Sequence, residues 1–227
     1  MAVYVLLNQK GGVGKSTLTV NLAAVTAEAT QEPDTENQSV LAVSVDPQGS
    51  ATWWSERVDD LPFVITQEDN PETLRGLSDL TNFSSIFVDT PGWLGAGGDD
   101  PMIKVLMEAA DLVVIPTLPQ PLAFDPTART VEVVQSYGIP YVVVINGWDP
   151  RDGKASLTDT QNLIKGQGWP LAKTVIRQYR IHTNAAAEGR VVTSYPDNKI
   201  SFNARSDFRS SHSNSRRAGG DCGYQAH

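Results

Sequence analysis

Cysteine is almost absent from this sequence: the one residue of that type is Cys222, near the C-terminus. A single cysteine forms no internal disulfide and supplies no cysteine cluster for a metal ion or an iron–sulfur group. The sequence also has no apolar run near the roughly 18–20 residues that span a bilayer. Its start lacks the basic segment, apolar stretch and small-residue cleavage site of a secretory signal. We therefore expect a cytoplasmic protein that does not interact with a membrane.

Lysine and arginine are also fewer than aspartate and glutamate. The chain has 18 lysines and arginines against 26 aspartates and glutamates, which gives a formal net charge of -8. This balance provides no general attraction for nucleic acid. Hydrophobic residues make up 40% of the 227 residues, so the chain is long and apolar enough to form one α/β domain with a sizeable core.

The stretch from Asn8 to Thr17, NQKGGVGKST, is the clearest signal in the sequence. It follows an apolar run at residues 3–7, which predicts a buried strand, and precedes an alanine-rich helical pattern at residues 18–29. In a strand, glycine-rich loop and helix of this kind, backbone N–H groups and the helix N-terminus bind phosphate. Lys15 is then placed to reach the β- and γ-phosphates, and the Ser16 hydroxyl to ligate Mg²⁺.

The start of this loop departs from the common G-x-x-x-x-G-K-[ST] pattern. Gln9 stands where the first glycine is expected, and a second lysine, Lys10, follows it directly. This K-G-G-x-G-K-[ST] form resembles the loop of the ParA/MinD family of P-loop ATPases. The resemblance implies that Lys10 reaches across a dimer interface to the partner subunit's nucleotide. It also implies ATP and Mg²⁺ as cofactors, bound by Lys10, Gly11, Gly12, Val13, Gly14, Lys15, Ser16 and Thr17.

Asp46 follows a second apolar run, residues 40–45, which predicts another strand. A carboxylate at the C-terminal end of a parallel strand lies on the ligand edge of an open α/β sheet. The same residue also fits the simpler role of capping the next helix. ParA-like proteins carry D-x-Q-x-x-x-T at this point, and Asp46, Gln48 and Thr52 match it. The resemblance implies that Asp46 acts on the attacking water and lies in the Mg²⁺ region.

Asp89 ends a further apolar run, residues 85–88, and Gly92 follows it closely. This is the Walker-B pattern, although a plain strand-end turn has the same sequence. On the functional interpretation, Asp89 holds Mg²⁺ through a water molecule and the Gly92 N–H senses the γ-phosphate. The glycine-rich segment 93–100 is then a switch that orders with nucleotide. The predicted metal ligands are Ser16, Asp46 and Asp89.

The rest of the chain alternates predicted strands and helices with short links. Further strands are expected at residues 63–66, at an edge of the sheet, and at 112–116, 141–146 and 172–176, with helices at 71–80, 102–110, 125–137 and 156–166. Asp125 is expected to cap the helix that Pro126 opens. The alternation predicts an α/β fold with a doubly wound, mostly parallel sheet flanked by helices. Combined with the phosphate loop, this is the P-loop NTPase fold.

Two residues near later strand ends are candidates for contacting the nucleotide base. Asn146 closes the strand at 141–146, and the resemblance implies contact with the adenine ring, although an asparagine before glycine equally predicts a turn. Further on, the family carries a proline, an arginine and a glutamate. This chain has Arg177, Gln178 and Asn184 in the same frame. The candidates are therefore Asn146 and Arg177.

The resemblance covers roughly residues 1–197, which we predict to be a ParA-like P-loop ATPase domain. Residues 198–227 are rich in Ser, Arg, Gly and Asn and nearly free of aliphatic residues. We predict that this polar tail is disordered and that its removal leaves the fold and the nucleotide site intact. The tail could touch DNA phosphates, and a solvated tail is the simpler interpretation.

The resemblance implies an ATPase that segregates plasmid or chromosomal DNA. ATP would join two subunits into a homodimer that binds DNA non-specifically on the nucleoid, and hydrolysis stimulated by a centromere-binding ParB-like protein would release it. One alternative is a MinD-like or other deviant-Walker ATPase that positions a non-DNA cargo. A MinD-like role needs an amphipathic membrane-targeting helix at the C-terminus, and the tail lacks that pattern. The other alternative is a nucleotide-binding switch with little hydrolysis.

Overall fold

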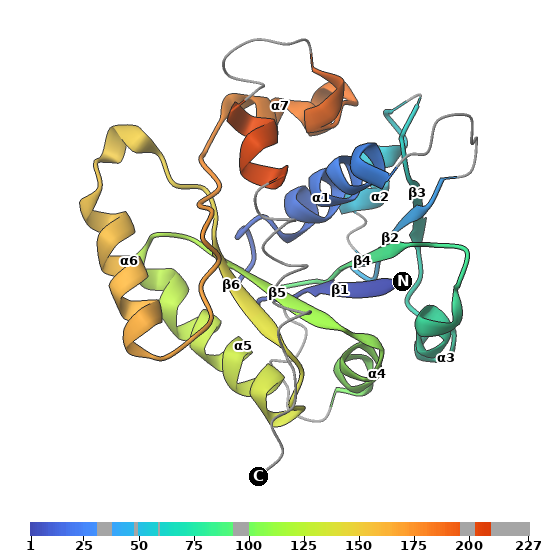
Figure 1. The fold of residues 1–227 in the computed structure, drawn as a ribbon, viewed down its shortest axis with the longest axis horizontal. Coiled ribbons are helices and arrows are strands. Elements are labelled where there is room, and N and C mark those ends of the chain that lie inside the picture. Colours follow the sequence, from blue (N-terminus) through green and yellow to red (C-terminus); the bar gives the residue numbers. More distant parts are fainter. Residues whose placement is uncertain (31–37, 48–49, 59, 93–99, 196–202, 210–227) are drawn as a thin grey trace.

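A six-stranded parallel sheet forms the centre of the computed structural model, which describes residues 1–30, 38–47, 50–58, 60–92, 100–195 and 203–209. The strand order is β3-β2-β4-β1-β5-β6, and every neighbouring pair is parallel (Figure 1). The predicted doubly wound α/β fold is therefore confirmed, with the first strand inside the sheet and β3 at an edge. The strands are β1 (Ala2–Leu6), β2 (Val40–Ser44), β3 (Val64–Gln67), β4 (Ser85–Asp89), β5 (Leu112–Thr117) and β6 (Tyr141–Ile145).

Helices cover both faces of the sheet (Figure 1). One face carries α1, α2 and α7, and the other carries α3, α4, α5 and α6. No helix in the described part of the chain is long and apolar enough to cross a membrane. The α-helices are α1 (Lys15–Thr30), α2 (Ser50–Ser55), α3 (Pro71–Arg75), α4 (Pro101–Ala109), α5 (Phe124–Ser136), α6 (Ala155–Gly166) and α7 (Arg180–Glu188), and the short 3₁₀ helices are η1 (Gly76–Asp79), η2 (Pro121–Ala123), η3 (Pro150–Asp152) and η4 (Val192–Ser194).

The strands bury both of their faces. In β1, Tyr4 and Leu6 pack in the cluster that contains α1, whereas Val3 and Val5 pack in the cluster that contains α4 and α5. Because successive strand residues point to opposite faces and both faces are covered, the run is apolar throughout rather than alternating. This explains why short apolar runs in the sequence were sufficient to locate these strands.

The predicted strand at residues 172–176 does not form a regular strand. The backbone N–H of Ala172 donates to Val143 O, and that of Ile176 donates to Ile145 O, both at 2.9 Å. A regular ladder advances by two residues on both chains between such bonds, so this segment has two extra residues relative to β6 here. The segment therefore runs beside β6 with an interrupted ladder, which leaves its position less firmly fixed by the sheet.

The expected cap of α5 is also wrong. The 3₁₀ helix η2 runs directly into α5, and Ala123 occupies the N-cap position without a side-chain cap. Asp125 lies in the first turn instead, because the proline that starts the helical path is Pro121 rather than Pro126. A carboxylate in the first turn is still favoured by the helix dipole.

The prediction of an unpacked tail is wrong for residues 203–209. These residues are helical, and Ala204 and Phe208 are completely buried in the core cluster that contains α1. Arg209 also forms an ion pair with Glu28 of α1, with Nη2 and Oε2 2.9 Å apart. Two buried side chains in one helical turn are too few to produce a visible periodicity in the sequence. The other residues of the predicted tail, 198–202 and 210–227, lie outside the described residues.

Candidate functional site

The glycine-rich loop joins β1 to α1 through two glycines with positive φ angles, Gly12 and Gly14. Gly14 has φ 89°, a left-handed conformation that other residues rarely adopt. A Cβ at this position would also clash with the side-chain amide of Asn146. Because α1 begins at Lys15, directly after the loop, the unpaired N–H groups and the dipole of the helix N-terminus face the loop.

Lys15 is buried at the base of the loop, with 7% of its surface exposed. Its Nζ donates to two main-chain carbonyls, Asn8 O at 3.2 Å and Lys10 O at 3.3 Å. Burial lowers the pKa of Lys15, whereas the carboxylates of Asp89 and Asp46 act in the opposite direction. A buried ammonium held by two long hydrogen bonds gains stabilisation from a polyphosphate, which supplies the missing negative charge.

Asp89 is completely buried at the end of β4. Within the described residues, neither of its carboxylate oxygens has a hydrogen-bond partner at ordinary distance. Burial raises the pKa of Asp89 to about 7, and the nearby Ser16 hydroxyl and Lys15 ammonium lower it by less. Leaving a buried carboxylate unpaired is costly, and a divalent cation removes that cost.

Asp46 lies at the same edge of the sheet, two residues after the end of β2. It is half-buried and lies close enough to raise the pKa values of both Lys15 and Asp89. Since α2 begins at Ser50, Asp46 is not the N-cap of that helix. The structure thus brings the three predicted metal ligands together as a set of hydroxyl and carboxylate oxygens, which suits Mg²⁺. These ligands are Ser16, Asp46 and Asp89.

The start of the loop is anchored to α5 by a buried polar network that the sequence analysis missed. Asn8 is completely buried, and its Nδ2 donates to Thr127 Oγ1 at 3.0 Å, while its Oδ1 accepts from the Lys10 N–H at 2.8 Å. The Gln9 N–H donates to Thr130 Oγ1 at 3.0 Å. A sequence feature that could have indicated this network is the pair Thr127 and Thr130, which are three residues apart on one face of α5. These bonds fix the position of the main chain at Gln9 and Lys10.

The side chain of Lys10 is placed differently from that of Lys15. Lys10 is half-exposed, and among the residues that the structure describes its ammonium has no ion-pair partner. Lys15 already occupies the buried position behind the loop. The two lysines therefore lie in different environments, and the cross-subunit role of Lys10 stays a prediction.

The segment after β4 packs directly on the loop. Thr90 Oγ1 donates to Leu6 O at 2.6 Å, and a Cβ on Gly92 would lie 2.9 Å from the Gly11 nitrogen. Only glycine permits so close an approach. This position agrees with the predicted sensing of a γ-phosphate by Gly92, which stays a prediction. Most of the predicted switch segment, residues 93–99, lies outside the described residues.

A pocket of about 470 Å³ opens beside the loop and contains both candidates for base contact. Asn146 Nδ2 donates to Val13 O at 2.7 Å, which ties the end of β6 to the loop. The guanidinium of Arg177 is engaged with Asp207, with Nη2 and Oδ1 2.7 Å apart. The pocket is lined by Gly12, Thr17, Leu118, Gln120, Asn146, Gly147, Arg177, Gln178, Tyr179 and His182.

Comparison with known proteins agrees with this geometry. A family model described as "CobQ/CobB/MinD/ParA nucleotide binding domain" matches residues 4–192. The chain is 37% identical over 210 residues to "Maintenance of carboxysome distribution protein A" of Gloeobacter kilaueensis, covering 91% of this chain and 90% of that protein. It is 28% identical over 191 residues to the protein of the same name from Halothiobacillus neapolitanus, covering 80% and 82%.

Solved structures show the same fold. The "MinC:MinD cell division protein complex" of Aquifex aeolicus aligns with a TM-score of 0.71 at 15% identity, covering 100% of this chain and 99% of that chain. The family model spans the loop, both strand-end aspartates, Asn146 and Arg177. The chain belongs to the CobQ/CobB/MinD/ParA nucleotide-binding family, and its deviant loop places it with the ParA/MinD ATPases.

Proposed function

We propose that this protein is a Mg²⁺-dependent ATPase of the ParA/MinD type that positions a cargo other than DNA. The observation that carries the choice of cargo is the 37% identity, over nine-tenths of both chains, to a protein named for carboxysome distribution. This favours the alternative of a non-DNA cargo over the expected role in plasmid partition. A large protein compartment is the corresponding cargo for this chain, and an adaptor on that compartment replaces the ParB-like partner.

The residues around the loop can be assigned roles in ATP hydrolysis. Lys15 and the loop N–H groups bind the β- and γ-phosphates, and the pocket beside the loop takes the base. Ser16 and Asp89 would hold Mg²⁺, which neutralises phosphate charge when bound. Asp46, at the end of β2, accepts a hydrogen bond from the attacking water and orients it. Basal turnover is expected to be slow, because this site binds and positions the nucleotide better than it activates water.

ATP binding is proposed to join two copies of the chain. Lys10 is half-exposed on a main chain anchored by Asn8 and Thr130. Its ammonium can meet the phosphates of a facing subunit, and the negative charge of that nucleotide offsets the loss of hydration. The dimer is then the cargo-binding state, and hydrolysis ends it.

Cargo identity can be tested in the organism that carries this gene. Deleting the gene should cluster or missegregate its large protein compartments while plasmid retention stays unchanged. A Lys15→Ala allele should reproduce the deletion, and an allele with the exposed Lys165→Ala substitution should not. Loss of plasmids with normally distributed compartments would overturn the choice of cargo and restore DNA partition as the function.

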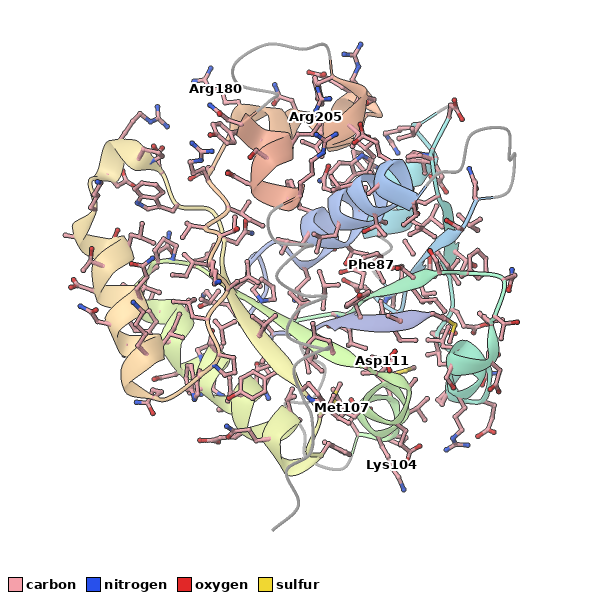
Figure 2. All side chains as sticks on the ribbon, viewed as in Figure 1. Phe87, Lys104, Met107, Asp111, Arg180 and Arg205 are labelled. Carbon is pink, nitrogen blue, oxygen red and sulfur yellow. The ribbon has the colours of Figure 1, made fainter. Side chains whose placement is uncertain are left out.

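Non-specific DNA remains a candidate second partner because Arg180, at the start of α7, is exposed. Figure 2 shows Arg180 at the end of the molecule that α7 occupies, whereas Arg205, at the same end, is partly buried and donates from Nη2 to Tyr195 O at 3.2 Å. Phosphate contacts of this kind are independent of sequence and weaken steeply with salt. With ATP and Mg²⁺ present, the dimer should bind random duplex DNA at low salt, and Arg180→Ala should weaken this binding. Arg75→Ala, on α3, is the matched control; absence of binding would remove DNA as a partner and leave the ATPase proposal standing.

A further inference from the structure

One carboxylate in the segment 203–209 is bound to a residue of the pocket wall through three hydrogen bonds. Asp207 Oδ1 accepts from Arg177 Nη2 at 2.7 Å, and Asp207 Oδ2 accepts from Arg177 Nε at 3.1 Å. The same Oδ2 also accepts from the Arg177 backbone N–H at 3.2 Å. Asp207 therefore fixes both the guanidinium and the main chain of a residue that lines the nucleotide pocket.

The Asp207–Arg177 pair is sheltered from solvent. The Asp207 side chain is 8% exposed and that of Arg177 is 30% exposed. The guanidinium carbon also lies 5.3 Å from the centre of the Tyr179 ring, which is a second pocket-lining residue. A bidentate ion pair with a third hydrogen bond to the backbone has one favourable geometry. It therefore fixes the position of Arg177 more firmly than a surface ion pair would.

An aromatic row connects the same segment to the pocket. The Phe208 ring meets His182 edge-on with centroids 5.2 Å apart, and His182 meets Tyr179 edge-on at 5.5 Å. His182 and Tyr179 line the pocket, and Phe208 is completely buried. Burial lowers the pKa of His182 to about 4, so the His182 side chain is neutral near pH 7. The segment 203–209 therefore contacts the pocket wall at two residues, Arg177 through Asp207 and His182 through Phe208.

The sheet holds this wall from one side, and Trp148 N–H donating to Ile176 O at 3.3 Å is one of the bonds that do so. The chain at residues 176–178 bonds to the end of β6 and the loop after it, through Ile176 N–H to Ile145 O and Gln178 N–H to Trp148 O. The two-residue bulge just before it interrupts the ladder. Asp207 adds three hydrogen bonds to the same stretch from the segment 203–209, including one to the Arg177 backbone N–H.

We propose that Asp207 is a positioning residue for nucleotide recognition, so that base binding requires the segment 203–209 to be docked. The inference rests on the nucleotide site proposed above and adds a residue from outside the family's motifs. Linkage makes the coupling reciprocal: a bound base stabilises the docked segment by the same factor by which the segment strengthens base binding.

The test separates recognition of the base from recognition of the phosphates. Affinities of the full chain for Mg-ATP, Mg-GTP and inorganic tripolyphosphate are measured for the parent and for Asp207→Asn. The variant should bind ATP about tenfold more weakly, within the usual range of coupling between sites. Its affinity for tripolyphosphate should stay within about twofold of the parent, and its preference between ATP and GTP should narrow.

Two further variants make the result specific. Arg209→Gln removes the ion pair of the same segment with Glu28 on α1, away from the pocket, and should leave ATP affinity unchanged. Arg177→Gln combined with Asp207→Asn should lose no more ATP affinity than the larger of the two single losses, because both act through one pair. Equal loss of ATP and tripolyphosphate, unchanged ATP affinity in Asp207→Asn, or the same loss in Arg209→Gln would overturn the inference. Failure of the proposed function would differ, since the parent itself would then bind neither nucleotide nor tripolyphosphate.

Discussion

The glycine-rich loop and the C-terminal segment 203–209 both serve one pocket, yet they are specified in opposite ways. The loop between β1 and α1 takes its shape from ten consecutive residues whose types fit phosphate binding. The segment 203–209 is held by Asp207 on Arg177, 30 residues earlier, and by Arg209 on Glu28 of α1. The loop is therefore defined by local sequence, and the segment by contacts made only after folding.

This difference shows where sequence reasoning succeeds. A local motif carries its geometry within itself, because backbone conformation and side-chain chemistry are set by neighbouring residues. A docked helical turn with two buried side chains is recognised only through its distant partners. A polar composition is consequently a poor guide to packing when arginines and aspartates pair with each other.

Removing the segment should give the largest effect on stability. A chain ending before Asn203 loses the buried Phe208 and Ala204 and the Asp207–Arg177 pair. Loss of a buried aromatic side chain alone costs about 3–5 kcal/mol, which lowers the thermal midpoint of a domain this size by roughly 10 °C. Calorimetry against a chain ending at Ser210, which keeps the segment, is the comparison. Equal midpoints for the two chains would show that the segment contributes nothing to the fold.

On the loop side of the comparison, Lys15→Ala should weaken ATP binding about 100-fold. Two charge-assisted hydrogen bonds to phosphate are worth about 3 kcal/mol together, and each 1.4 kcal/mol is tenfold. Titration calorimetry measures the affinity, and Lys165→Ala, at an exposed position on α6, is the control. An affinity for ATP within about threefold of the parent would remove the phosphate-loop assignment.

Asp89→Asn should stabilise the chain in the absence of nucleotide and Mg²⁺. The carboxylate is completely buried, and its burial outweighs the Ser16 hydroxyl and the Lys15 ammonium, so that its pKa is raised to about 7. Replacing this charge by a neutral amide is worth about 1–3 kcal/mol above that pH, a rise of a few degrees. Asp111→Asn is the matched control. Its Oδ2 accepts from the Val3 N–H at 2.7 Å, so that substitution should destabilise the fold. Destabilisation by both changes would mean that Asp89 is paired in the folded protein and is not held for a cation.

Most of the fold was predictable because each buried parallel strand is a short apolar run that ends at a turn or a polar residue. The irregular path at residues 172–176 was not predictable, since the same residues suit a regular strand. Its bulge is set by where Ala172 and Ile176 bond to β6. The end of the chain was misjudged for a similar reason, because Phe208 is isolated in the sequence and buried only by elements far from it.

The candidate site divides in the same way. The loop and the strand-end aspartates could be predicted because the order of strand, turn and polar residue places them at one edge of the sheet. The anchor of the loop on α5 could not, since Asn8 and Thr127 are 119 residues apart and only the fold brings them together. The contact of Asp207 with Arg177 could not be predicted either, because only the fold brings these two residues together. From the sequence, Arg177 was expected to contact the base.

The central claim is that ATP joins two copies of this chain through Lys10, and sedimentation velocity with ATP and Mg²⁺ tests it most directly. Asp46→Ala is used as the background because it should bind ATP without hydrolysing it, so that the dimer persists. On this background Lys10→Ala should still bind ATP but sediment as a monomer, whereas the exposed Lys165→Ala should sediment as a dimer. An ATP-dependent dimer of full extent in the Lys10→Ala, Asp46→Ala chain would contradict the cross-subunit role of Lys10 and leave an ordinary P-loop ATPase.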